Sequence, residues 1–166
     1  MKHTVSPFLL PDLFFGGCAI LTFKNEGKGT HMTVKVSQMR NKVDRKIKLP
    51  IFNVRISLLG DGEQGMVYAG MIFKETGSYK VANGVDPNGR IGKALAFLNA
   101  AVKNTDLLKE RNVSFQHNGK CCSCGMTLTH PASIPTGFGP DCLNHKLNDP
   151  NFKIMFNMTF PDYEYK

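Results

Sequence analysis

Four of the five cysteines of this chain lie between Cys121 and Cys142. Cys121 and Cys124 form a C-x2-C pair, a spacing that lets a tight turn direct both sulfurs at one tetrahedral metal ion. Gly125 follows the pair and allows the backbone to curl beneath the ion. Cys142 supplies a third thiolate, and one imidazole would complete four ligands. The spacing therefore predicts a single zinc ion with a structural role.

Two histidines compete for the fourth ligand position. His145 forms C-x2-H with Cys142, as at the start of a helix, whereas His117 forms H-x3-C with Cys121. Cys122 is a weaker third candidate, because adjacent thiolates rarely turn to the same ion. The spacing alone leaves these alternatives open.

The segment from His117 to Cys142 follows the pattern H-x3-C-x2-C-G-x2-L-T-x-P-x-S-I-x2-G-x-G-P-x-C. This pattern resembles a C-terminal zinc-binding domain of unknown function that occurs in small bacteriophage proteins. The resemblance implies a phage origin and a zinc fold, and it carries no assigned activity. Such relatives commonly have a histidine four residues before the first cysteine. The resemblance therefore favours His117 as the fourth ligand, with His145 as the runner-up. One departure is Met126, where relatives often have arginine.

The same segment argues against catalysis by the metal. A hydrolytic zinc keeps one position open for water and has a nearby carboxylate as general base. No glutamate lies between Arg111 and Asn157, and Asp141 is better interpreted as a residue at a helix N-terminus. We therefore expect a protein that is not an enzyme. A zinc-dependent activity on nucleotides is the enzymatic alternative.

Hydrophobic periodicity predicts an α+β fold, in which a small antiparallel sheet carries one packed amphipathic helix and a C-terminal zinc-binding module. Short alternating segments separated by glycine-rich turns indicate strands at 19–23, 30–36, 52–58, 66–73, 79–81 and 113–116. Apolar residues then recur at helical spacing from Ile91 to Val102. We expect a sheet-and-helix domain at 1–112, a zinc module at 113–148 and an aromatic tail at 149–166. The tail would pack back as a strand or dock a partner.

The formal net charge of +8 favours a polyanionic partner, because cations that meet phosphates release counterions. Six of the basic residues lie in one run, from Lys35 to Lys48, which we expect to form a hairpin extension or an edge loop. We predict nucleic-acid contacts there from Lys35, Arg40, Lys42, Arg45, Lys46 and Lys48. The alternative for this run is a solvated sheet edge, for which lysines are a common device.

The number and clustering of the cysteines predict a protein of a reducing compartment. Clustered cysteines in odd number fit a metal site better than a disulfide framework, and we expect Cys18 to be a buried structural thiol. The apolar run from Pro7 to Phe23 is interrupted by Pro11, Asp12 and two glycines, so it predicts neither a signal peptide nor a membrane span. We expect a protein of the bacterial host cytoplasm.

Two functions follow from these patterns. The first is a non-enzymatic accessory protein that binds nucleic acid through its basic run. The second is an interaction factor that uses the aromatic tail to bind and inhibit or redirect a host defence or transcription protein.

Overall fold

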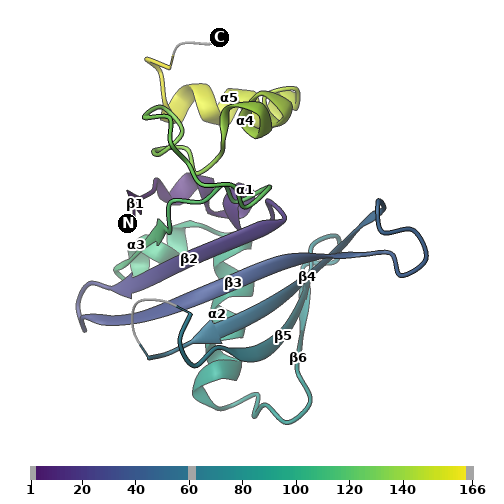
Figure 1. The fold of residues 1–166 in the computed structure, drawn as a ribbon. Helices are drawn as coiled ribbons and strands as arrows, with labels where there is room; N and C mark the ends of the chain where they lie inside the picture. Colours follow the sequence, from purple (N-terminus) through teal and green to yellow (C-terminus); the bar gives the residue numbers. More distant parts are fainter. Residues whose placement is uncertain (1–2, 60–62, 164–166) are drawn as a thin grey trace.

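The computed structural model describes residues 3–59 and 63–163, so 60–62, the first two residues and the last three residues of the tail lie outside it. Within these residues seven strands form one antiparallel sheet in the order β1-β7-β2-β3-β4-β5-β6 (Figure 1). Their bounds are β1 His3–Thr4, β2 Cys18–Asn25, β3 Thr30–Arg40, β4 Lys48–Ser57, β5 Val67–Phe73, β6 Ser78–Val81 and β7 Val113–His117. The predicted α+β class and every predicted strand of the sheet are confirmed.

One face of the sheet forms the hydrophobic core. The alternation in the strands turns side chains such as Val34, Val36, Val54 and Ile56 to this face, and all four are buried. The predicted amphipathic helix is α2, Arg90–Lys103, which buries an apolar stripe against the sheet. The short helix α3, Asp106–Glu110, packs beside it at β7.

The apolar run near the N-terminus folds as helix, which sequence periodicity did not indicate. A 3-10 turn, η1 at Pro7–Leu9, leads into α1, Leu10–Phe14. Pro11 is tolerated because it occupies the first turn of α1, where the backbone N–H has no partner within the helix. Leu10, Leu13 and Phe14 are fully buried, so this run belongs to the core.

The C-terminal part of the chain lies beyond one edge of the sheet (Figure 1). After β7, a loop leads to α4, Pro140–Lys146, and then to α5, Pro150–Thr159. The prediction of a strand in the tail is wrong. Phe152, Phe156 and Phe160 recur every fourth residue, which is helical spacing, and their rings pack in sequence along α5. Phe152 and Phe156 are buried in the core.

None of the helices in the described ranges is both long and apolar enough to cross a bilayer.

Candidate metal centre and basic hairpin

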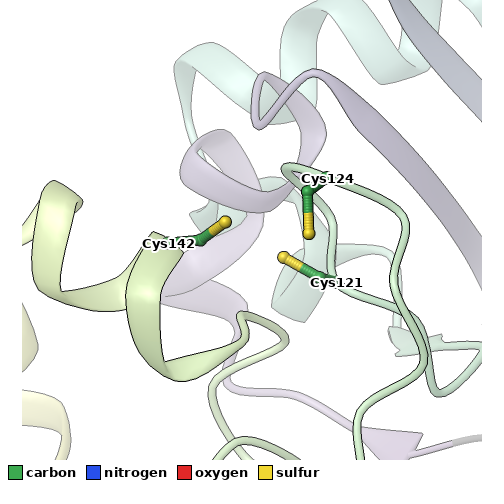
Figure 2. Close-up of side chains that lie close together, drawn as sticks. All are labelled: Cys121, Cys124 and Cys142. Atoms are coloured by element: carbon green, nitrogen blue, oxygen red, sulfur yellow. The ribbon is translucent and has the colours of Figure 1, made fainter.

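Three of the predicted zinc ligands come together at one point. Cys121 and Cys124 lie on the loop after β7, and Cys142 lies in the first turn of α4. Their sulfur atoms all lie within 4.8 Å of one another. Figure 2 shows the three side chains pointing toward a common centre. Residues from two separate elements thus converge on a space where one metal ion can bind.

The local backbone explains why the first two thiols face the same way. The Cys121 N–H donates to the Met126 carbonyl, and the Gly125 N–H donates to the Cys121 carbonyl, each at 2.8 Å. Gly125 has a φ of 79°, in the left-handed region that glycine adopts without strain. The C-x2-C-G segment is therefore a tight, internally bonded turn, as the sequence predicted.

The electrostatic surroundings shift the pKa of Cys121 and that of Cys142 in opposite directions. Burial opposes ionisation of the Cys121 thiol, but backbone N–H groups of Cys124, Gly139 and Ser123 donate to its sulfur and hold its pKa below the ordinary value. Burial, followed by the negative charge of Cys121, raises the pKa of Cys142 to about 11. The Cys121 thiol therefore ionises more readily than a free cysteine, and the Cys142 thiol less readily. A bound cation removes this conflict, because it favours the deprotonated form of every thiol that it contacts.

His117, the favoured fourth ligand, lies outside the three-cysteine group. Its ring is fully buried, and Nε2 lies 2.6 Å from the Ile134 carbonyl oxygen. The Gly119 N–H donates to Nδ1 at 2.9 Å, so Nδ1 is an acceptor and Nε2 carries the proton. The ring therefore fastens β7 to the two loop segments that surround the cysteines.

His145, the runner-up, lies on α4 three residues after Cys142 and is exposed. Residues at this spacing share one side of a helix. The structure groups neither histidine with the thiols, and it gives the His145 ring no hydrogen-bond partner among the described residues. Cys122, the third candidate, is buried beside the core, and burial raises the pKa of its thiol.

With this geometry described, the segment can be compared with known proteins. Residues 112–145 match a family of unknown function (DUF6011). The match covers β7, both histidines and the three clustered cysteines. No curated protein and no solved structure matches the chain.

The DUF6011-like segment is held against the N-terminal part of the chain by close backbone contacts. The Cys18 N–H donates to the Cys122 carbonyl at 2.8 Å. A Cβ atom on Gly16 would lie 2.6 Å from the same carbonyl oxygen, so only glycine permits this approach. In the sequence, Gly16 and Gly17 stand out only because they interrupt an apolar run. Nothing in a single sequence indicates which distant carbonyl packs against a glycine.

The expectation for Cys18 is wrong, because its side chain is exposed rather than buried. It begins β2 at the junction with the DUF6011-like segment, where a Cβ atom on Gly125 would lie 3.2 Å from its sulfur. The apolar residues that follow Cys18 in β2 do face the core. Its position at the end of the strand accounts for its exposure.

The predicted basic run divides into two parts. Strand β2 pairs with β3 only as far as Ser37, and β5 pairs with β4 only as far as Ile51. Residues 39–49 therefore form a two-stranded ribbon outside the sheet, which we call the hairpin arm (Figure 1). Five of the six predicted cations lie on the hairpin arm, and all five are exposed: Arg40, Lys42, Arg45, Lys46 and Lys48. Lys35 lies on the sheet instead, where it pairs with Glu63 at 3.3 Å.

Arg40 and Lys48 occupy directly opposed positions on the two strands of the hairpin arm. Like charges in such a pair repel each other and destabilise a sheet. Arg40 also donates to the Arg45 carbonyl at 3.1 Å, which brings its guanidinium toward the cationic turn. The hairpin arm therefore concentrates positive charge at a cost to its own folding, an arrangement that an anionic partner would stabilise.

Proposed function

We propose that this chain is a non-enzymatic accessory protein of bacteriophage origin that binds nucleic acid through its hairpin arm and carries one structural zinc ion. The observation that carries the proposal is the hairpin arm, which projects five exposed cations beyond the sheet against one acidic residue, Asp44. The phage setting rests on the resemblance of the cysteine segment to small bacteriophage proteins.

Zinc is the ion that fits the donor set best. Thiolates are soft ligands that select zinc over magnesium or calcium, and three of them converge within 4.8 Å. The three sulfurs of Cys121, Cys124 and Cys142 would hold the ion. A zinc ion held by these residues would link the loop after β7 to helix α4.

We assign the fourth position to His145. His117 would have to give up the hydrogen bond that its Nδ1 accepts from Gly119, or move Nε2 away from the Ile134 carbonyl. His145 is exposed and lies on the same helix as Cys142. A movement of its side chain toward the thiols would break no hydrogen bond to a described residue.

A structural role is favoured over a catalytic one. A set of three thiolates and one imidazole leaves no position for an activated water molecule. The nearest acidic residue in sequence, Asp141, lies in the first turn of α4, where a carboxylate offsets the partial positive charge of the helix N-terminus. Zinc-dependent chemistry on nucleotides is the enzymatic alternative, and it would require a general base that this segment does not supply.

The geometry of the hairpin arm suits a phosphate backbone. A two-stranded ribbon is narrow enough to enter a groove of B-form DNA or to follow a single strand. Its cations come from both strands and from the turn, so phosphates on either side of the ribbon are within reach. Each phosphate neutralised in this way releases counterions, which makes the affinity depend strongly on salt.

The experiment compares two triple variants of equal net charge. In the first, Lys42, Arg45 and Lys46 of the hairpin arm become glutamine. In the control, glutamine replaces three exposed lysines elsewhere: Lys80, Lys93 and Lys109. Binding of a fluorescent duplex and of a single strand is measured against salt concentration. Removal of three phosphate contacts should reduce the slope of log affinity against log salt by about 2 to 3.

The control variant should keep the native slope. Equal losses in the two variants would mean that net charge alone attracts the nucleic acid. Absence of binding by the native chain to either nucleic acid at low salt would refute the proposed function.

The second candidate is a protein-interaction factor. The tail aromatics that suggested it are packed within the chain, since Phe156 contacts Phe152, Phe160 and Tyr163. The outer side of α5 nevertheless exposes Ile154 at 62% and Met158 at 80%, four residues apart. If this surface binds a host protein, serine at both positions should abolish the complex and leave nucleic-acid binding unchanged. Retention of that complex in the double variant would exclude the surface.

A further inference from the structure

The turn of the hairpin arm carries a strongly exposed apolar residue. Val43 is 97% exposed, between Lys42 and Asp44, and Ile47, in the same turn just before β4, is 50% exposed. A turn selected only for solubility would place polar residues at such positions. Much of both side chains faces solvent in the free protein, so their burial against a partner would stabilise the complex.

The turn that presents Val43 is held by its own hydrogen bonds. The Asn41 side-chain oxygen accepts from the N–H groups of Val43 and Asp44 at 2.9 and 3.1 Å. The Asn41 N–H donates to the Ile47 carbonyl at 2.9 Å, and the Asp44 carboxylate accepts from the Lys46 N–H at 3.1 Å. The apolar tip is therefore fixed in place before any partner arrives, and binding need not order it.

Building on the proposed function, we propose that the hairpin arm lies in the minor groove of duplex DNA and inserts Val43 between two base pairs. Apolar side chains act as wedges of this kind in proteins that kink DNA from the minor groove. The cations on both strands of the ribbon would meet the phosphates on the two sides of the groove. Ile47, close behind the tip, would pack against the deoxyribose rings.

The same chemistry selects DNA over duplex RNA. The minor groove of an RNA duplex is wide and shallow and displays 2′-hydroxyl groups. Val43 and Ile47 offer those hydroxyls no hydrogen-bond partner, and a wide groove does not grip a narrow ribbon. Insertion is easiest at pyrimidine–purine steps, which unstack at the lowest cost.

The test uses the full chain and a DNA duplex of about 20 base pairs with one central TA step. A 2-aminopurine beside that step reports unstacking, and dyes on the two ends report bending by energy transfer. The native protein should raise both signals. Val43→Thr keeps the branched shape but replaces one methyl group with a hydroxyl. It should lose most of both signals and about tenfold in affinity, with the salt slope unchanged.

Val67→Thr is the matched control, because Val67 is an exposed valine on β5 away from the hairpin arm. It should behave as the native chain does. Native unstacking and bending in Val43→Thr would overturn the wedge and leave the proposed function intact. The wedge would also be overturned, with the proposed function intact, if the native protein bound an RNA duplex of the same sequence with equal affinity. The same holds if it bound single strands alone. Loss of all nucleic-acid binding in the native chain would instead refute the proposed function itself.

Discussion

The ammonium group of Lys146 lies 3.5 Å from the carboxylate of Asp12, and this ion pair joins helix α4 to helix α1. The same ammonium lies 5.3 Å from the ring centroid of Phe138 and 5.0 Å from that of Phe152. The lysine therefore connects the N-terminal helix, the helix that carries Cys142 and the aromatic packing of α5. The contact partly buries a charged pair at the junction between the sheet and the metal-binding part.

We predict that this junction makes stability depend on pH through Asp12. Burial of the carboxylate outweighs the attraction of Lys146 and raises the pKa of Asp12 above its ordinary value of 3.8. Between 3.8 and the raised value the folded state holds more protons than the unfolded state, so Asp12 lowers the free energy of unfolding as pH rises. The destabilisation is complete above the raised pKa and absent below 3.8.

Urea unfolding of the native chain and of Asp12→Asn, at several pH values from about 4 to about 7, measures this contribution. The stability of the variant minus that of the native chain should increase with pH and then level off. Protonation of metal ligands affects both proteins and cancels in the difference. A difference that is constant with pH, or one that decreases, would contradict the prediction.

The second prediction concerns the metal. Cys124→Ala removes a thiol at the exposed side of the cluster and should reduce the bound zinc from one ion per chain to none. The sheet and α2 should stay folded, because most of their buried residues, such as Val34, Val54 and Leu95, come from elements outside the cysteine loop. Cys122→Ala is the control. Its thiol is buried outside the cluster, so zinc content should stay at one ion while stability falls by about 1 kcal/mol.

Metal analysis and circular dichroism of the purified variants give both readouts. Zinc retained at full stoichiometry in Cys124→Ala would exclude this cysteine as a ligand. Global unfolding of that variant would show instead that the ion supports the whole fold.

The third prediction separates the two histidines. His145→Ala should change the visible spectrum of the cobalt-substituted protein and weaken zinc binding, because it removes the assigned fourth ligand. His117→Ala should leave that spectrum unchanged and lower stability by about 2 to 4 kcal/mol, because it removes two buried hydrogen bonds of a ring that fastens three segments. If the spectrum instead changes in His117→Ala alone, the ligand assignment reverses.

Local patterns were sufficient to predict six of the seven described strands, and the short edge strand β1 was missed. Alternation in 52–58 identifies β4, and helical spacing in 91–102 identifies α2. Each element buries one face, so its apolar residues recur with the period of a strand or of a helix. The C-x2-C-G turn was predictable for a similar reason, since its hydrogen bonds lie within a few residues. The helical spacing of Phe152, Phe156 and Phe160 was equally visible, and it could have identified α5.

The parts that escaped prediction depend on contacts between distant residues. His117 has suitable spacing for a zinc ligand, yet its ring nitrogens are taken by Gly119 and Ile134, and no periodicity reveals this. The length of the hairpin arm was hidden too, because β3 and β4 continue past their neighbours in a segment that buries no residue. Where no face is buried, the sequence carries no period to detect.

The last prediction concerns Gly16, where the N-terminal part meets the DUF6011-like segment. Gly16→Ala places a Cβ atom 2.6 Å from the Cys122 carbonyl oxygen and 3.1 Å from that of Leu13, so the backbone must move. We expect a loss of about 1 to 3 kcal/mol in the free energy of unfolding.

Gly139→Ala is the matched control: a Cβ atom there meets nothing within 4 Å, and its φ of −66° suits alanine. Chemical denaturation should leave this control within about 0.5 kcal/mol of the native chain. Equal stability of the two variants would mean that the junction is not closely packed at Gly16.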